Sequence, residues 1–167
     1  SFAANSAHVA ARIRRWYGRT ARVIHPWVDT DRFRPGVGAG GRYDLILSAL
    51  VPYKRIDVAL QAYEGRDEEL VVAGDGVERD RLVRLAPRNV RFLGWLGAEE
   101  TVHLVQGCRA LLFPGEEDFG IVPVEAMACG KPVVALGRGG ALETVVDGQT
   151  GVLFDEATPA ALRTAID

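Results

Sequence analysis

The chain has 167 residues, of which 48% are apolar, and this is enough to form the core of one modest α/β domain. Its net charge of −2 argues against a protein that binds nucleic acid through the phosphate backbone, because such domains usually carry a basic face. No apolar run approaches the roughly 18 residues of a membrane-spanning helix, so we expect any membrane contact to be peripheral. The isolated Cys108 and Cys129 lie beside apolar segments, which favours buried free thiols and a reducing, cytoplasmic compartment.

Residues 1–35 predict a strand end, a helix and a second strand. The helix runs from about Ala7 to Tyr17 and is stopped by a glycine, and the strand from Arg22 to His25 is broken by a proline. Residues 36–42 are rich in glycine and are expected to form a flexible linker. The chain begins without Met and stops inside a helix that Thr158 caps, so we expect a fragment of a longer protein.

From residue 43 onward, short apolar runs alternate with segments of helical pattern. Such alternation predicts an α/β fold with a parallel sheet and helices on both of its faces. Ligands of these sheets bind beyond the carboxyl ends of the strands, where the loops at 48–55, 74–76, 94–96, 114–120 and 137–140 are expected to lie. The expected strands are 44–48, 70–73, 90–93, 110–113, 133–136 and 152–154, and the expected helices are 56–63, 77–85, 99–105, 123–129 and 141–146.

Two glutamates, Glu117 and Glu125, form the most informative pattern in the chain. An apolar strand precedes them and Pro123 suits the first turn of a helix, so we expect Glu117 on a loop and Glu125 in the first helical turn. Backbone N–H groups from Gly120 to Val122 offer an anion site between the two carboxylates. This arrangement suits a polyhydroxylated ligand that bears a phosphate. A metal pair, an acid/base pair and a solvated acidic turn remain open alternatives.

Three blocks of the sequence closely resemble the family 4 retaining glycosyltransferases. The first covers residues 48–57, and the second, residues 116–134, contains Glu-x7-Glu with Phe-Gly after its first Glu. The third block covers residues 137–148. The resemblance implies that residues 43–167 are the Rossmann-like, donor-binding C-terminal half of a GT-B enzyme. It also implies that residues 1–35 are the tail of an N-terminal, acceptor-binding domain whose remainder is missing.

The resemblance implies a retaining, metal-independent transfer of a sugar from a GDP- or UDP-linked donor to an acceptor hydroxyl. It is closest to bacterial mannosyltransferases of O-antigen and exopolysaccharide assembly, which favours GDP-mannose, although no residue reads mannose or guanine directly. No cofactor is expected besides the nucleotide-sugar substrate, and the acceptor would be a glycan or lipid-linked sugar bound by the missing domain. We expect a cytoplasmic protein, with peripheral association at the inner membrane face left open, no nucleic-acid partner, and no transfer by the isolated chain.

The same resemblance assigns roles to individual residues. Glu117 would hold hydroxyls of the transferred sugar and Glu125 the ribose hydroxyls, while Lys54 would contact the diphosphate. Because departure of the leaving group builds negative charge on the distal phosphate, a cation and a helix N-terminus there stabilise the transition state more than the ground state. The other implied donor-binding groups are the amides of Phe119, Gly120, Ile121 and Val122, the nucleobase wall at Phe92 and Leu93, and the turn at Gly139 and Gly140.

Each of the weaker assignments has a structural alternative. Lys54, expected at the start of a helix, could be a solvated surface cation. Phe92 and Leu93 could belong to an ordinary core strand, and the pair 139–140 could form a plain tight turn. Glu143 is expected to interact with the dipole of its own helix rather than with a ligand.

One departure from the family pattern concerns phosphate binding. Relatives commonly carry Gly-Arg where this chain has Ser48-Ala49, so the usual second phosphate cation is absent. Arg55, Arg138 or backbone amides are the candidates to replace it.

Two functions of other classes remain open. The segment 74–76, Gly-Asp-Gly after an apolar strand, suggests a nicotinamide-dependent Rossmann oxidoreductase, but Arg79 stands where a third glycine would be due and no acidic residue ends the next strand. A non-catalytic nucleotide-binding module is the other alternative.

Overall fold

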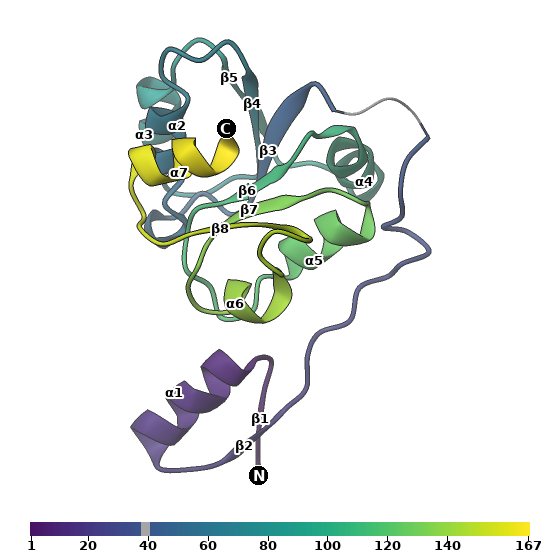
Figure 1. Cartoon of the computed structure of the whole chain (residues 1–167), viewed down its shortest axis with the longest axis vertical. Coiled ribbons are helices and arrows are strands. Elements are labelled where there is room, and N and C mark those ends of the chain that lie inside the picture. The colour runs from purple at the N-terminus through teal and green to yellow at the C-terminus, as the bar shows by residue number, and fades with distance from the viewer. Residues whose placement is uncertain (38–40) are drawn as a thin grey trace.

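The computed structural model describes residues 1–37 and 41–167. They form a domain built on a six-stranded sheet and a smaller N-terminal unit below it (Figure 1). Part of the expected linker, residues 38–40, lies outside the described residues.

The sheet of the domain is parallel throughout, as the alternation of strands and helices predicts. Its spatial order is β5-β4-β3-β6-β7-β8, so the chain moves outward from β3 to β5 and then returns to β6, beside β3. The switch point of the sheet therefore lies between β3 and β6. The strands are β3 (Tyr43–Leu47), β4 (Glu69–Ala73), β5 (Val90–Gly94), β6 (Leu111–Phe113), β7 (Val133–Leu136) and β8 (Gly151–Phe154).

Helices cover both faces of the sheet (Figure 1). Neighbouring strand residues point to opposite faces, so Leu111 joins one buried apolar cluster and Leu112 the other. One cluster lies under α2, α3 and α7, and the other under α4, α5 and α6. The helices are α2 (Ile56–Ala62), α3 (Arg79–Leu85), α4 (Ala98–Gly107), α5 (Ile121–Ala128), α6 (Ala141–Thr144) and α7 (Pro159–Ile166), and a 3-10 turn, η1, covers Pro52–Lys54.

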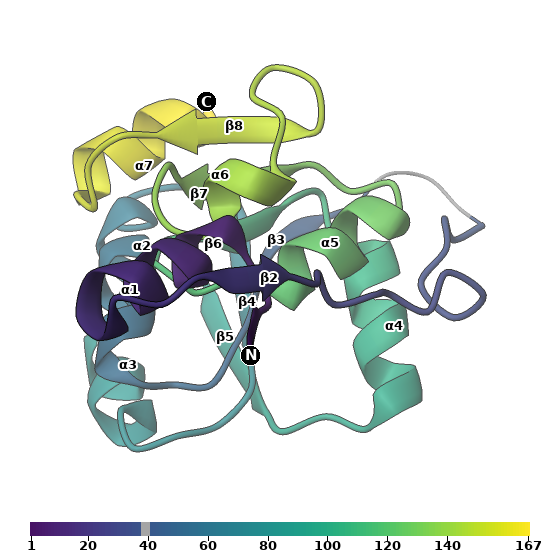
Figure 2. The ribbon, with the colours of Figure 1, turned by 90° about the horizontal axis from the view of Figure 1, so that it is seen from below.

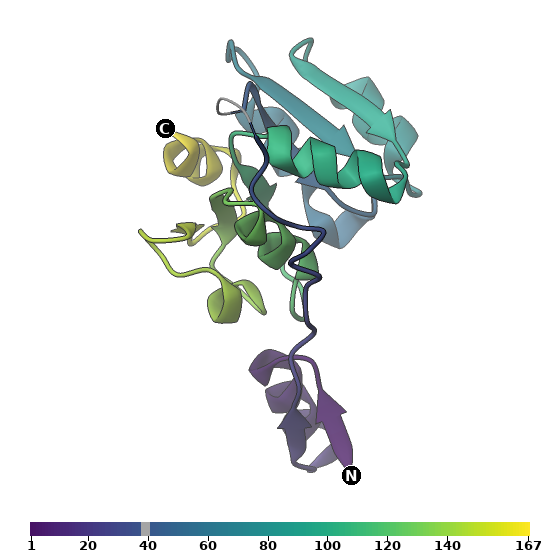
Figure 3. The same ribbon diagram turned by 90° about the vertical axis from the view of Figure 1, so that its right-hand side faces the viewer.

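The N-terminal unit consists of β1 (Phe2–Ala4), α1 (Ala7–Tyr17) and β2 (Ala21–Val23), with the two strands parallel. The predicted helix bounds are confirmed, and the second strand is shorter than the expected range of 22–25. An extended segment, residues 24–37, connects the unit to the domain and runs past α5 and α4 (Figures 1 and 3). Seen from below, α1 and β2 lie across the middle of this end of the domain (Figure 2).

The start of α5 corrects one expectation. The helix begins at Ile121 and not at Pro123, so Glu125 lies in the second turn rather than the first. Gly120 precedes the helix with φ of 80°, and a Cβ atom there would lie 2.9 Å from the ring of Phe113. Glycine is therefore needed to turn the chain into the helix at this earlier position.

The segment that follows β3 corrects a second expectation. Lys54 closes the 3-10 turn instead of beginning an α-helix, and Arg55 separates it from α2 with φ of 51°. Arg55 is the one non-glycine residue with positive φ among the described residues. This left-handed conformation is costly for a residue with a Cβ atom, so the surrounding structure must hold it in place.

A buried polar network fastens the amino end of β3. Asp44 is 1% exposed and accepts two hydrogen bonds from Arg109, at 2.9 Å from Nε and 2.5 Å from Nη2. The hydroxyl of Tyr63 also donates to Asp44. Burial and the neighbouring Asp44 carboxylate raise the pKa of Tyr63, so the phenol stays protonated as a donor. Both cysteines are buried free thiols, as expected.

The longest helix of the described residues, α1, has 11 residues, and none of these helices could span a membrane.

Candidate functional site

The switch point brings Lys54 and Glu117 together. Loops that follow neighbouring strands on either side of such a point diverge and leave a crevice at the carboxyl ends. Lys54 lies on the loop after β3 and Glu117 on the loop after β6, and Nζ of Lys54 forms an ion pair with Oε1 of Glu117. Their side chains are only 13% and 20% exposed, so solvent screens this pair less than an ordinary surface pair.

Glycines allow the backbones around this pair to approach closely. A Cβ atom at Gly115 would lie 2.7 Å from Cα of Lys54, and one at Gly139 would lie 2.3 Å from the carbonyl oxygen of Glu117. The N–H of Gly140 donates to that same carbonyl at 2.8 Å. The turn at Gly139 and Gly140 therefore supports the loop that carries Glu117, whereas a contact of this turn with a donor phosphate stays a prediction.

The first residues of α5 follow the same loop. Phe119 and Gly120 are buried, and Ile121 and Val122 are half-buried. The first N–H groups of an α-helix have no partner within the helix, and its N-terminus carries a partial positive charge. The sequence-predicted amides from Phe119 to Val122 thus lie within five residues of Glu117, at an end of the helix that attracts anions.

Glu125 is half-buried on the second turn of α5. Burial raises the pKa of its carboxyl, and the positive charge of Arg32 partly opposes that rise. No hydrogen bond from the described residues contributes to this shift. A half-buried carboxyl with a raised pKa and no donor of its own is a candidate for ligand binding.

Phe92 and Leu93 lie on β5, the outermost strand on their side of the sheet. Both are half-buried, and they pack against opposite clusters, Phe92 on the face of α2 and Leu93 on the face of α4. The structure accounts for these side chains as core packing. Their role as a nucleobase wall stays a prediction, and it can involve only their exposed parts.

The glycines at 74 and 76 have a structural explanation. A Cβ atom at Gly74 would lie 1.9 Å from the carbonyl oxygen of Ser48, and one at Gly76 would lie 2.4 Å from that of Leu50. The N–H of Leu50 donates to the carbonyl of Asp75 at 2.9 Å. The two glycines are therefore needed for this segment to pack against the loop after β3. Dinucleotide binding is not required to explain their presence.

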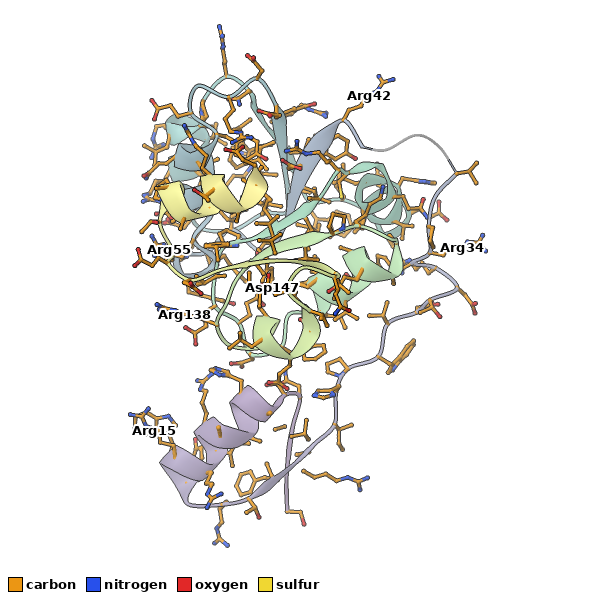
Figure 4. All side chains as sticks on the ribbon, viewed as in Figure 1. Arg15, Arg34, Arg42, Arg55, Arg138 and Asp147 are labelled. Carbon is orange, nitrogen blue, oxygen red and sulfur yellow. The ribbon has the colours of Figure 1, made fainter. Side chains whose placement is uncertain are left out.

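The two candidate replacements for the missing phosphate cation differ in their contacts. Arg55 already pairs with Asp57, with Nε at 3.3 Å from Oδ1. Arg138 is exposed on the loop after β7 and has no ion pair among the described residues. Both arginines extend from the same side of the domain, as the labelled side chains in Figure 4 show. Arg138 is thus the freer of the two cations.

A cavity of about 330 Å³ lies beside the acidic loop. It is lined by Glu116, Glu117 and Asp118 of that loop, by Tyr53, and by Arg12 of α1. The contribution of α1 was not expected from the sequence. A signal for it exists, because the first 28 residues contain no acidic residue whereas three acidic residues follow one another at 116–118.

Within residues 1–37 and 41–167, no three His, Cys, Asp or Glu side chains are gathered closely enough to hold a metal ion.

Known proteins resemble the chain over most of its length. Residues 28–167 match the family model for glycosyl transferases group 1. A GDP-mannose-dependent α-(1-6)-phosphatidylinositol monomannoside mannosyltransferase of Mycolicibacterium smegmatis is 34% identical, and the match covers 96% of this chain and 50% of that protein. A D-inositol 3-phosphate glycosyltransferase of Streptomyces avermitilis is 35% identical over 95% of this chain and 41% of the relative. The chain thus spans half or less of the length of these relatives.

A solved structure agrees with these matches. The Anabaena protein Alr3699/HepE, in complex with UDP, superposes with a TM-score of 0.84 and 27% identity, over 98% of this chain and 52% of that protein. The structural neighbours are GT-B glycosyltransferases, so the expected fold is confirmed and the nicotinamide alternative is not favoured. The chain belongs to the glycosyl transferases group 1 family.

Proposed function

We propose that this chain binds the donor of a retaining glycosyltransferase that moves a hexose, with mannose as the first candidate, from a nucleotide sugar to an acceptor hydroxyl. The observation that carries the proposal is the ion pair of Lys54 and Glu117 at the switch point of the sheet. The N-terminus of α5 follows on the same loop. A cation, a carboxylate and a helix N-terminus together suit a ligand that has both phosphate and hydroxyl groups.

In this proposal the ion pair orients the side chains of Lys54 and Glu117 before the donor binds. A bound diphosphate takes over the charge of Lys54, and Glu117 is then free to accept hydrogen bonds from hydroxyls of the transferred sugar. The amides from Phe119 to Val122 face the negative charge that develops on the leaving phosphate, and they stabilise the transition state more than the ground state. No step requires a metal ion or a cofactor.

The nucleoside part of the donor is assigned to two other places. Glu125 would accept hydrogen bonds from the ribose hydroxyls, since its carboxyl is half-buried and no hydrogen bond from the described residues contributes to its pKa shift. The exposed parts of Phe92 and Leu93 would border the base. One relative is named as GDP-mannose-dependent and one structural neighbour was solved with UDP, which supports a nucleoside diphosphate without deciding the base.

We also propose that residues 1–35 are the tail of an acceptor-binding domain, joined through residues 36–42 to the donor domain at 43–167. The support is that the chain spans about half of its relatives. The isolated chain should then bind a nucleoside diphosphate and transfer no sugar, because the groups that orient the acceptor are absent. Turnover onto any acceptor by this chain would contradict the assignment.

The first test compares ligands by thermal shift. GDP, UDP, GDP-mannose and UDP-glucose are each added at increasing concentration, with NAD as the comparison ligand. A ligand at 100 times its Kd stabilises the native state by about 2.7 kcal/mol, which raises the Tm of a domain of this size by several degrees. We expect GDP or UDP and the matching sugar to raise the Tm, with or without EDTA. A shift with NAD alone would favour the oxidoreductase.

The second test separates the two contacts by calorimetric titration. Lys54→Ala should weaken only ligands that carry the diphosphate, whereas Glu125→Ala should weaken nucleoside and nucleoside diphosphate by similar factors. Loss of one hydrogen bond to a charged group corresponds to roughly 10- to 100-fold in Kd. Lys131→Ala is the matched control, because Lys131 precedes β7 and lies at the opposite end of the sheet. If Glu125→Ala leaves nucleoside binding intact, the ribose assignment is wrong.

A further inference from the structure

Glu143 of α6 makes contacts that its place in the sequence does not suggest. Its carboxylate accepts hydrogen bonds from the N–H groups of Ala7 at 2.8 Å and His8 at 2.9 Å, the first two residues of α1. Glu143 lies in the first turn of α6, but its carboxylate binds the N-terminus of α1, which precedes it by more than 100 residues in the sequence. Glu143 therefore joins the N-terminal unit to the domain.

The acidic loop makes further contacts with the same helix. Nε2 of His8 lies 3.7 Å from Oε1 of Glu116, and Nη1 of Arg12 lies 2.5 Å from Oδ1 of Asp118. The two residues that flank Glu117 are thus paired with one face of α1. Together with Glu143, these pairs make up what we call the α1 contact.

His25 connects Glu143 to the start of α5. Its ring stacks on the ring of Phe119 with centroids 5.6 Å apart, and its Nε2 lies 3.3 Å from Oε2 of Glu143. Phe119 is 7% exposed and is the second residue after Glu117. One carboxylate therefore holds both the N-terminus of α1 and the aromatic ring that covers Phe119.

The charges of the two parts are complementary. Residues 1–37 contain seven arginines and two aspartates, and residues 41–167 contain 13 basic and 20 acidic residues. Burial alone would raise the pKa of Glu143, but hydrogen bonds from Ala7, His8 and His25 outweigh it and lower that pKa. The carboxylate is accordingly ionised at neutral pH, in the form that the backbone N–H groups of Ala7 and His8 favour.

We infer that Glu143 is a positioning residue of the donor site. It holds α1 and His25 against the acidic loop, and the loop in turn presents Glu117 and the N-terminus of α5 to the ligand. Binding of the N-terminal unit and binding of the donor are then coupled, because each favours the same conformation of residues 116–120. The inference rests on the donor site proposed above, and it extends that site to a helix and a carboxylate outside the crevice.

The test uses three variants of the whole chain. Glu143→Ala removes the carboxylate, His25→Ala removes the stacked ring and leaves α6 unaltered, and Glu99→Ala is the matched control. Glu99 also lies in the first turn of a helix and is exposed, and it has no ion pair among the described residues. Two NMR signals report on the structure without any ligand. One is the NOE between the rings of His25 and Phe119, and the other is the exchange rate of the Gly140 amide, which is bonded to Glu117.

We expect Glu143→Ala to abolish the NOE, and both Glu143→Ala and His25→Ala to speed exchange at Gly140. GDP or UDP, whichever binds the unaltered chain, should bind these two variants about 5-fold or more weakly, at the lower end of coupling between linked sites. Glu143→Gln should give an exchange rate and an affinity between those of Glu143→Ala and the unaltered chain, since its amide oxygen can accept one N–H without the charge. Glu99→Ala should behave as the unaltered chain in every measurement.

Two outcomes would overturn the inference. An NOE that persists in Glu143→Ala would show that the residue does not hold the N-terminal unit. Unchanged Gly140 exchange and unchanged affinity, despite a lost NOE, would show that the contact does not position the loop. If the unaltered chain binds neither GDP nor UDP, the proposed function fails by itself, and the exchange rates of the two variants still decide whether the loop depends on α1.

Discussion

The fold of the domain and the attachment of the N-terminal unit to it depend on different physical interactions. The domain buries two apolar clusters, one on each face of its sheet, and residues such as Leu45 and Leu111 have no exposed surface. α1 has no buried residue, and the unit meets the domain through carboxylates, arginine, histidine and backbone N–H groups. The first kind of contact depends on exclusion of water, and the second depends on charge, so they should respond to different perturbations.

The connecting segment, residues 24–37, differs from the N-terminal unit because part of it packs into the apolar core of the domain. Phe33 is 7% exposed and packs into the cluster under α4 and α5, and Nε2 of Gln106 donates to the carbonyl of Arg34 at 2.9 Å. Trp27, a few residues earlier, is 82% exposed. The chain is therefore fastened to the core at Phe33, with Val28 packed against the same cluster, whereas α1 meets the domain through polar contacts. We therefore expect that the N-terminal unit can detach without unfolding of the domain.

The largest effect should come from the core. Leu111→Ala removes a fully buried side chain from β6 and should lower the free energy of unfolding by about 2–5 kcal/mol. Trp27→Ala removes a larger but exposed side chain and should change it by less than about 0.5 kcal/mol. Denaturant unfolding measures both, provided that the slope with denaturant is unchanged. Equal losses of unfolding free energy for the two substitutions would show that burial of Leu111 does not distinguish the domain from the exposed part of the chain at Trp27.

A second prediction contrasts two ion pairs. Asp44→Asn breaks the buried network with Arg109 and Tyr63 and should cost about 3 kcal/mol, the lower end for a buried pair because Arg109 is 43% exposed. Asp118→Asn breaks the ion pair with Arg12. The two side chains are 55% and 54% exposed, so the free energy of unfolding should fall by at most about 1 kcal/mol. The same unfolding experiment applies. A larger loss for Asp118→Asn would mean that the N-terminal unit contributes to the stability of the domain.

The smallest effect concerns pH. Burial would raise the pKa of Glu143, but hydrogen bonds lower it below the ordinary 4.5, so its contribution to the α1 contact is present above that value and is lost as the pH falls through the lowered pKa. His8 and His25 face Glu116 and Glu143, and Arg12 faces Asp118.

The NOE between His25 and Phe119 should therefore persist from about pH 7 to pH 5 and weaken only below the ordinary carboxyl range. Glu143→Gln removes the titrating group and serves as the control. High salt should weaken the contact at every pH, because its ion pairs are largely exposed. Loss of the NOE between pH 7 and pH 6 would contradict the assignment to Glu143.

Most of the sheet could be predicted from the sequence because its strands are buried on both faces. The runs at 70–73 and 133–136 are continuous apolar segments, and each coincides with a strand to within one residue. The start of α5 could not be placed correctly. Pro123 is a favourable first helical residue, but the left-handed Gly120 allows the helix to begin earlier, and a local pattern does not distinguish these starts.

The candidate site was predictable in part for a similar reason. Lys54 and Glu117 each follow a strand, and parallel strands end at one edge, so their approach follows from the alternation. The contacts of Glu143 with Ala7 and His8 join residues more than 100 positions apart, on elements whose relative placement no local pattern specifies. Only the uneven distribution of charge pointed toward them.

The network around Asp44 has a consequence for how this domain can change. It fastens the amino end of β3, whereas Lys54 and Glu117 follow the carboxyl ends of β3 and β6. Substitutions that alter the choice of ligand therefore need not weaken the residues that keep the sheet assembled. Stabilising substitutions at the amino ends of the strands could therefore offset the loss of stability caused by substitutions that change ligand specificity at the carboxyl ends.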